Sequence, residues 1–147
     1  MSEESTRRPK SVPGALRALI VDDDHINARF LEEVLAPYAV CLKAGNGAEA
    51  VRAFEESLAA NDPFDLIFMD ILMPGMDGHQ ALETIRKIER TRAISEEGGV
   101  KVIMISAFDD MKNVSRAFFQ GHALSFLNKP FTVDAVIQEL RRFHFIG

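Results

Sequence analysis

The sequence predicts an α/β domain built on a parallel β-sheet with helices on both faces. From residue 15 onward, short apolar runs alternate with longer segments of helical period. The apolar runs are continuous, which is typical of strands that are buried on both faces. The alternation completes five strand–helix units within 147 residues, a length that suits a single domain.

The chain is expected to begin with a short tail outside the folded domain. Residues 1–14 are polar and include basic side chains and two prolines. Such a segment buries too little apolar surface to offset the entropy lost on ordering. We therefore expect a mobile tail over residues 1–14 and one domain over residues 15–147.

Each predicted strand is a short apolar run that ends close to a polar or turn-forming residue. The first run stops at Asp22, the third stops at Asp70 and the fourth leads into Ser106. These boundaries place the strands at residues 18–21, 40–42, 66–69, 100–105 and 124–127.

A helical segment follows each strand and carries its apolar residues on one stripe. The first helix ends at Pro37, because proline cannot continue a helix. The fourth is expected to begin at Asp109 or Asp110 and to stop at Gly121, and Thr132 is expected to cap the last. The predicted core stripes of the first and last helices are Ile26, Phe30, Leu31, Val34 and Leu35, and Val133, Val136, Ile137 and Leu140.

The composition excludes several classes of protein. A net charge of −5 lacks the basic footprint of a domain that grips nucleic acid through its phosphates. No apolar run approaches the roughly 18 residues of a membrane span, and no secretion signal begins the chain. The single cysteine, Cys41, cannot form an intramolecular disulfide. We therefore expect a soluble, cytoplasmic protein that binds neither nucleic acid nor a membrane.

Acidic residues that are distant in the chain are expected to meet at one edge of the sheet. Asp22, Asp23 and Asp24 follow the first strand, and Asp70 follows the third. In a doubly wound sheet the ligand crevice lies at the carboxyl ends of the strands. Each residue alone could be a helix N-cap, but several gathered carboxylates repel each other unless a cation compensates. Oxygen ligands favour Mg²⁺ over zinc, and the neighbouring His25 is expected to be solvated.

A cation and a hydroxyl complete the candidate site. Lys129 follows the fifth strand and Ser106 ends the fourth. Together they can neutralise and hydrogen-bond the oxygens of a phosphoryl group. The alternative is that Lys129 forms a salt bridge to Asp70 while the Ser106 hydroxyl bonds the backbone. In the unmodified protein both interpretations of Lys129 can hold.

Four motifs follow one another in a specific order along the chain. They are the run 19–24 with its three aspartates, Asp70 with Met73-Pro74 and residues 76–78, Ser106-Ala107, and Lys129-Pro130-Phe131. In this combination the chain resembles the receiver domain of two-component response regulators over about residues 18–143. The resemblance implies a flavodoxin-like, five-stranded parallel sheet with strand order 2-1-3-4-5 and a cis Lys129-Pro130 bond.

The resemblance also implies a chemistry. Asp70 would take a phosphoryl group from a sensor histidine kinase or a histidine phosphotransfer protein. Asp22 and Asp23 would hold Mg²⁺ together with Asp70 and the backbone carbonyl of Leu72. The domain would be no enzyme beyond catalysing its own phosphorylation and dephosphorylation.

The implied output is a switch in packing. Ser106 and Lys129 would bind the phosphoryl oxygens, and Phe126 would fill the space that the Ser106 hydroxyl leaves as it moves inward. In the fourth helix, Phe119 lies off the inward stripe and pairs at i, i+4 with Ser115. We expect Phe119 and Ser115, with the fifth strand and the last helix, to face a downstream protein or a second copy of the chain.

Two positions differ from the usual pattern of the family. Leu72 stands two residues beyond Asp70, and Phe108 stands two residues beyond Ser106, where receivers often carry polar side chains. Neither side chain can orient an attacking water by a hydrogen bond, which predicts a long-lived phosphoryl form.

The sequence also bears on three other interpretations. A phosphatase of the haloacid-dehalogenase type would carry a second acid where Leu72 stands. A flavodoxin would carry a phosphate loop rich in Ser, Thr and Gly after the first strand, and this chain has aspartates there. A receiver that is never phosphorylated would serve only as a docking module, and the retention of Asp23, Asp70, Ser106 and Lys129 argues against it.

Overall fold

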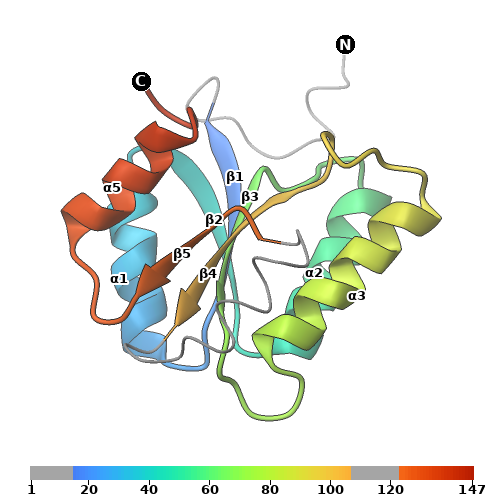
Figure 1. The fold of residues 1–147 in the computed structure, drawn as a ribbon, viewed down its shortest axis with the longest axis horizontal. Helices are drawn as coiled ribbons and strands as arrows, with labels where there is room; N and C mark the ends of the chain where they lie inside the picture. The colour runs from blue at the N-terminus through green and yellow to red at the C-terminus, as the bar shows by residue number, and fades with distance from the viewer. Residues whose placement is uncertain (1–14, 107–122) are drawn as a thin grey trace.

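The computed structural model describes residues 15–106 and 123–147, which form a sheet with helices on both faces (Figure 1). Five parallel strands lie in the order β2-β1-β3-β4-β5, which confirms the predicted flavodoxin-like sheet. In chain order the elements are β1 (Leu16–Val21), α1 (His25–Leu35), β2 (Ala39–Ala44), α2 (Gly47–Ala59), β3 (Leu66–Asp70), α3 (Gly78–Thr91), β4 (Lys101–Ser106), β5 (Ser125–Asn128) and α5 (Val133–Arg142).

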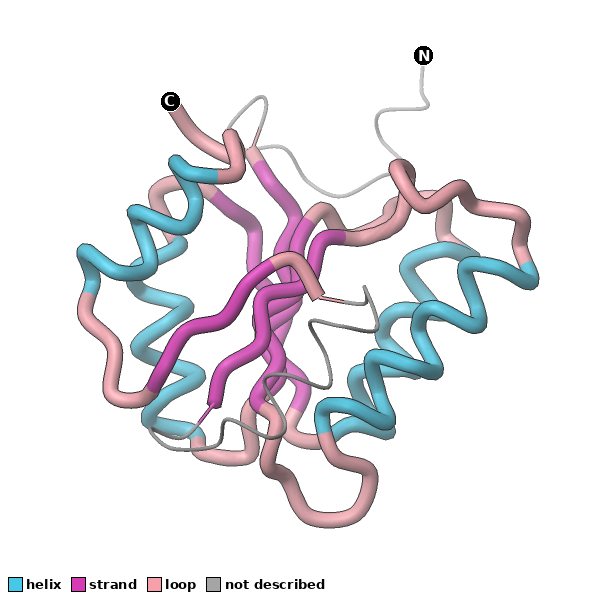
Figure 2. Tube along the Cα trace, viewed as in Figure 1, coloured by secondary structure: helices cyan, strands magenta, loops and turns pink. Residues whose placement is uncertain are grey.

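The sheet separates two apolar cores. One core lies between the sheet and helices α1 and α5, and the other lies between the sheet and helices α2 and α3 (Figure 2). Along β1, Leu19 and Val21 pack into the second core, whereas Ala18 and Ile20 pack into the first. All four side chains are fully buried, which is why this strand reads as a continuous apolar run.

Each described helix begins with a polar cap. The side chains of Asp24, Asn46, Asp77 and Thr132 accept hydrogen bonds from backbone N–H groups in the first turns of α1, α2, α3 and α5. Asp77 also forms a reciprocal capping box with Gln80. The prediction of Thr132 as the cap of the last helix is therefore confirmed.

Two residues of the predicted core stripes are exposed instead. Ile26 is 80% exposed and Val133 is 49% exposed. Ile26 is the second residue of α1 and Val133 is the first residue of α5. The helical period gives the face on which a residue lies, but not whether the sheet reaches as far as the first turn. Placing these two residues in the core was therefore wrong.

Two of the expected segments fall outside the described part of the chain, so their prediction stays untested. The expected tail at residues 1–14 and the expected fourth helix lie outside the described residues. Among the described helices, none is long and apolar enough to cross a membrane.

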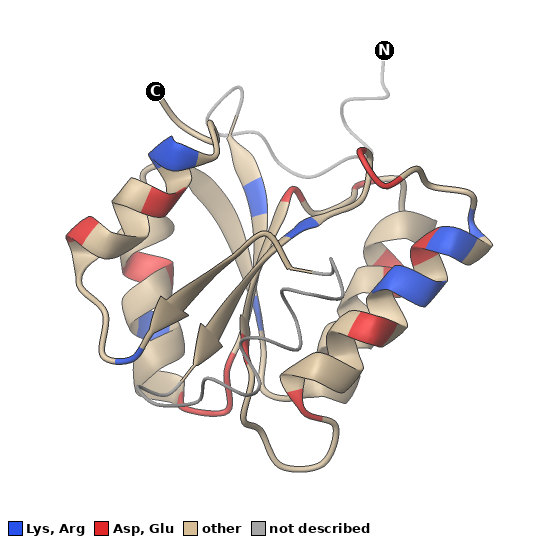
Figure 3. Cartoon of the chain, in the orientation of Figure 1, with Lys and Arg blue, Asp and Glu red and all other residues tan. Residues whose placement is uncertain are grey.

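The strand order places the ligand crevice at the carboxyl end of β1 and its neighbour β3. Strand β1 lies between β2 and β3, so the chain leaves β1 for β2 through α1 on one face of the sheet and then crosses back past β1 to β3 through α2 on the other face. Ligands of such sheets bind at the carboxyl ends of the strands, where the direction reverses. Figure 3 shows acidic residues in the loops at this edge of the sheet.

Candidate functional site

Three carboxylates meet at the carboxyl ends of β1 and β3. Asp22 and Asp23 directly follow β1, and Asp70 is the last residue of β3. The register pairs Val21 with Met69, so Asp22 and Asp70 come side by side. One oxygen from each of the three carboxylates lies within 4.8 Å of the others. Asp22 and Asp70 are buried whereas Asp23 is exposed, so the cluster can be reached from solvent.

Asp24, the third aspartate of the run, has a different place. Its side chain accepts from the backbone N–H groups of Ile26, at 2.9 Å, and Asn27, at 3.4 Å, and so caps α1. Its own backbone N–H donates to Asp22 Oδ1 at 2.9 Å. Asp24 thus fixes the start of the helix and orients the carboxylate of Asp22.

The second oxygen of Asp22 has an unusual environment. Asp22 Oδ2 is buried and has no hydrogen-bond partner among the described residues. Burying a charged oxygen without such a partner is costly, and a nearby cation offsets the cost. Lys129 Nζ offsets part of this cost from 3.6 Å, and the oxygen-only ligand set, with this acceptor free of hydrogen bonds among the described residues, fits a divalent cation such as Mg²⁺.

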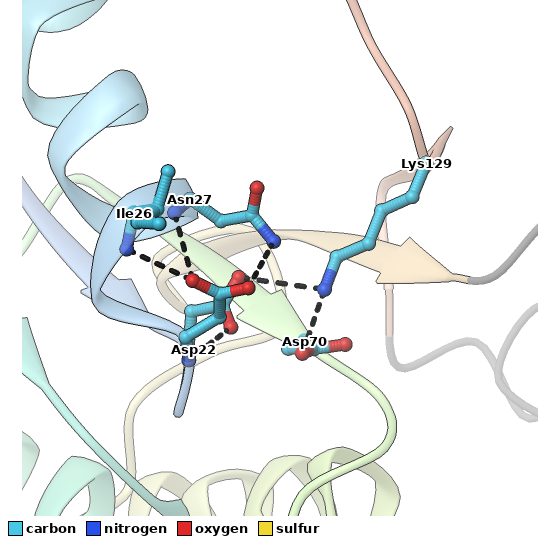
Figure 4. Close-up of polar contacts among 6 residues, drawn as sticks. Asp22, Ile26, Asn27, Asp70 and Lys129 are labelled. Carbon is cyan, nitrogen blue, oxygen red and sulfur yellow. Dashed lines mark hydrogen bonds and ion pairs between the residues drawn. The ribbon is translucent and has the colours of Figure 1, made fainter.

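Lys129 reaches this cluster from the loop between β5 and α5 (Figure 4). Its Nζ donates to Asp70 Oδ2 at 3.0 Å and lies 3.6 Å from Asp22 Oδ2. The Lys129-Pro130 bond is cis, as the sequence resemblance implied. The next residue, Phe131, packs its ring on Phe30 of α1 with the ring centroids 5.8 Å apart, which ties the loop to the helix layer.

The cluster changes the acid–base properties of its members. Burial, assisted by the charge of Asp22, raises the pKa of Asp70 to about 6, although the hydrogen bond from Lys129 acts in the opposite direction. Burial disfavours the ammonium of Lys129, but its hydrogen bond to Asp70 and the charges of Asp70 and Asp22 outweigh burial and raise the pKa of Lys129. Lys129 is therefore charged at neutral pH.

The raised pKa of Asp70 predicts a pH-dependent effect on stability in protein freed of metal by a chelator. The unfolded chain ionises this carboxyl at lower pH than the folded one, so the carboxyl stabilises the fold in acid and loses this effect as the pH rises through about 6. We expect Asp70→Asn to raise the free energy of unfolding at neutral pH by about 1–2 kcal/mol. The gain should shrink towards pH 5. Urea unfolding at both pH values measures it, and a gain independent of pH would contradict this explanation.

The loop that follows Asp70 is held close to it by a glycine. A Cβ atom built at Gly78 would lie 2.3 Å from the carbonyl oxygen of Asp70 and 2.8 Å from Ile71 Cα, closer than any side chain allows. Gly78 also donates its N–H to the carbonyl of Ile71 at 2.8 Å. This close approach brings the start of α3 against the end of β3.

The Ser106 hydroxyl has a partner that the sequence analysis missed. Ser106 is fully buried at the end of β4, and its Oγ donates to Oδ1 of Asn128 at 3.1 Å. The strand register places these two residues opposite each other. The available signal was a polar residue directly before Lys129, but only the pairing of the fourth and fifth strands gives it a meaning.

The remaining predicted residues are placed as follows. Phe126 is partly buried on β5 and packs against the core beneath α2 and α3. Leu72 is 56% exposed at the start of the loop after β3. Phe108, Ser115 and Phe119 lie outside the described residues.

Comparisons with known proteins agree with this geometry. The family model for the response regulator receiver domain matches residues 18–141. The chemotaxis protein CheY of Bacillus subtilis (strain 168) is 35% identical over 130 residues, which cover 87% of this chain and 97% of that protein.

Solved structures share the fold. A chain of the CheX-CheY complex with BeF₃ and Mg²⁺ from Borrelia burgdorferi is similar with a TM-score of 0.72 and 27% identity, over 90% of both chains. The co-crystal structure of the Saccharomyces cerevisiae histidine phosphotransfer signalling protein Ypd1 with the receiver domain of its downstream response regulator Ssk1 is similar with a TM-score of 0.73. Its identity is 26%, over 85% of this chain and 86% of the matched chain. The chain therefore belongs to the family of response regulator receiver domains, which act in two-component signalling.

Proposed function

We propose that Asp70 accepts a phosphoryl group from a phosphohistidine of a sensor histidine kinase or a histidine phosphotransfer protein. The observation that carries this proposal is the position of Lys129 Nζ, 3.0 Å from Asp70 Oδ2, beside the open oxygen of Asp22. A nucleophile, a fixed positive charge and a set of metal ligands then share one crevice. Membership of the receiver family sets aside the phosphatase and flavodoxin interpretations.

The proposed reaction is a displacement at phosphorus. A carboxylate oxygen of Asp70 forms the new O–P bond while the P–N bond to the imidazole breaks, and the imidazole keeps the electron pair. Lys129 balances the negative charge of the phosphoryl oxygens during transfer, and the Ser106 hydroxyl donates to one of them afterwards. The raised pKa of Lys129 supports a permanently charged role.

The proposed Mg²⁺ ligands are Asp22, Asp23, Asp70 and the backbone carbonyl of Leu72. One oxygen from each of the three carboxylates already lies within 4.8 Å of the other two. A bound Mg²⁺ would supply the positive charge that lets the phosphoryl oxygens approach these carboxylates.

Solved complexes of other receiver domains agree with the proposed partners of this chain. The Ssk1 receiver has been crystallised with the histidine phosphotransfer protein Ypd1, and a CheY has been crystallised with CheX. For this chain we propose a histidine kinase or phosphotransfer protein as the phosphoryl donor. We propose a downstream protein, or a second copy of the chain, as the partner that responds to phosphorylation.

Acetyl phosphate provides the first test, because it needs no cognate kinase. The purified protein is incubated with acetyl phosphate and Mg²⁺, and its intact mass is measured with and without a chelator. We expect a gain of one phosphoryl group that acid removes and that the chelator prevents. An unchanged mass under all conditions would favour the docking module that is never phosphorylated.

A further prediction concerns the output surface. We expect Phe119→Ala to weaken phosphorylation-dependent association, with a partner or as a homodimer, by about tenfold, because aromatic anchors carry much of the energy of an interface. Phe126, the proposed switch residue, is partly buried on β5 and could change its exposure after phosphorylation. Sedimentation of the phosphorylated protein measures self-association. The Phe119→Ala variant should still be labelled at Asp70 as the wild type is. If the variant associates normally, both with itself and with its identified partner, then Phe119 is not part of the output surface.

A further inference from the structure

The hydrogen bond between Ser106 and Asn128 joins two side chains in very different environments. Ser106 is fully buried, whereas Asn128 is exposed at the end of β5. A buried hydroxyl needs a hydrogen-bond partner, but an exposed amide finds one in water. The bond at 3.1 Å therefore matters more to Ser106 than to Asn128.

The bond also lies beside the proposed phosphoryl site. Asn128 is followed by Lys129, whose backbone N–H donates to the carbonyl of Ser106 at 2.8 Å. The side chain of Lys129 contacts Asp70, whereas the side chain of Asn128 contacts Ser106. Two consecutive residues of one strand end thus hold the acceptor carboxylate and the hydroxyl that would bind its phosphoryl group.

The hydroxyl cannot donate its single proton to two acceptors at full strength. In the structure it donates to Asn128 Oδ1. To donate to a phosphoryl oxygen on Asp70 it has to give up this bond, and the released amide of Asn128 is then solvated.

We propose that Asn128 is a positioning residue that holds the Ser106 hydroxyl away from Asp70 and so opposes the phosphorylated state. This inference rests on the proposed function of Asp70. The amide stabilises the resting arrangement of the hydroxyl, and binding of a phosphoryl group has to displace it. The strength of this one hydrogen bond sets part of the balance between the resting and the phosphorylated arrangement.

The test uses beryllium fluoride with Mg²⁺ as a stable substitute for the phosphoryl group. Because the chain contains no tryptophan, binding is followed by NMR of the ¹⁵N-labelled protein. We expect Asn128→Ala and Asn128→Leu each to bind beryllium fluoride about two- to tenfold more tightly than the wild type, as expected for losing one neutral hydrogen bond in the free state. Leu keeps the bulk of Asn without its acceptor, so agreement between the variants separates the hydrogen bond from packing.

A double-mutant cycle provides the decisive control. In a Ser106→Ala background, Asn128→Ala should leave the affinity unchanged, because the hydroxyl on which Asn128 acts is gone. Gln138→Leu, a change at an exposed site on α5, should leave the affinity of the wild type unchanged. If Asn128 had a purely structural role, its substitution would change the free energy of unfolding, and the effect would be the same with and without the Ser106 hydroxyl.

The outcomes separate this inference from the proposed function. Unchanged or weaker binding by the Asn128 variants, or a gain that persists without the Ser106 hydroxyl, overturns the role of Asn128 and leaves the role of Asp70 intact. If the wild type shows no binding that depends on Asp70, the proposed function is overturned and this inference with it.

Discussion

Asp70→Asn is expected to abolish acid-labile labelling of the protein by acetyl phosphate. The amide that replaces the carboxylate is a poor nucleophile, and it lacks the negative charge that pairs with Lys129 Nζ at 3.0 Å. Asp22 is a weaker candidate, because its Oδ2 lies 3.6 Å from Lys129 Nζ whereas Asp70 Oδ2 lies 3.0 Å from it. The remaining label, measured by intact mass, should fall to the background of the chelated sample.

The matched control is Asp65→Asn. Asp65 lies directly before β3, at the opposite end of the strand from Asp70, and accepts the backbone N–H of Arg17 at 2.8 Å. Asn keeps an oxygen that can accept this bond, so labelling should equal that of the wild type. Labelling of Asp70→Asn at the stoichiometry of the wild type would show that another residue is the acceptor.

The phosphoryl group on the wild-type protein is expected to be long-lived. Leu72 is 56% exposed two residues beyond Asp70, and its side chain has no atom that can hydrogen-bond a water molecule. Phe108 lies outside the described residues, but its side chain has the same deficiency. Replacing Leu72 by Asn and Phe108 by Glu together should speed dephosphorylation about tenfold or more, since both new side chains can orient the attacking water.

The decay is measured by intact mass after the donor has been removed. Leu42→Asn is the control, because Leu42 is also an exposed leucine but lies on β2, away from Asp70. It should leave the decay unchanged. A wild-type lifetime of seconds, unaltered by the double substitution, would contradict a role for these two positions.

The meeting of the site residues at one edge of the sheet could be predicted from the sequence, because it follows from the topology of the strands. Strands that are continuous apolar runs must be covered on both faces, and parallel strands put all their carboxyl ends at one edge. Residues at or directly after the carboxyl ends of such strands, such as Asp22, Asp70 and Lys129, therefore come to the same edge of the sheet. The hydrogen bond at 3.0 Å between Lys129 and Asp70 agrees with one of the two predicted interpretations of Lys129.

Other features depend on information that a one-dimensional pattern does not contain. The contact of Asn128 with Ser106 arises from the register between β4 and β5, and the periodicity of either strand does not encode this register. Ile26 and Val133 have the right helical face, but they stand in first turns where the sheet no longer covers them. The errors therefore concern how elements are placed against each other, not which elements form.

Reduction of the phosphorylated protein with borohydride identifies the residue that carries the phosphoryl group most directly. Borohydride converts an aspartyl phosphate to homoserine, so the modified position can be read by peptide sequencing in a mass spectrometer. If Asp70 is the acceptor, then after treatment with acetyl phosphate and Mg²⁺ homoserine occurs at position 70 and Asp22 and Asp23 stay unmodified. Homoserine at another position, or none in a sample that carries the phosphoryl mass, would contradict the assignment of Asp70 as the acceptor.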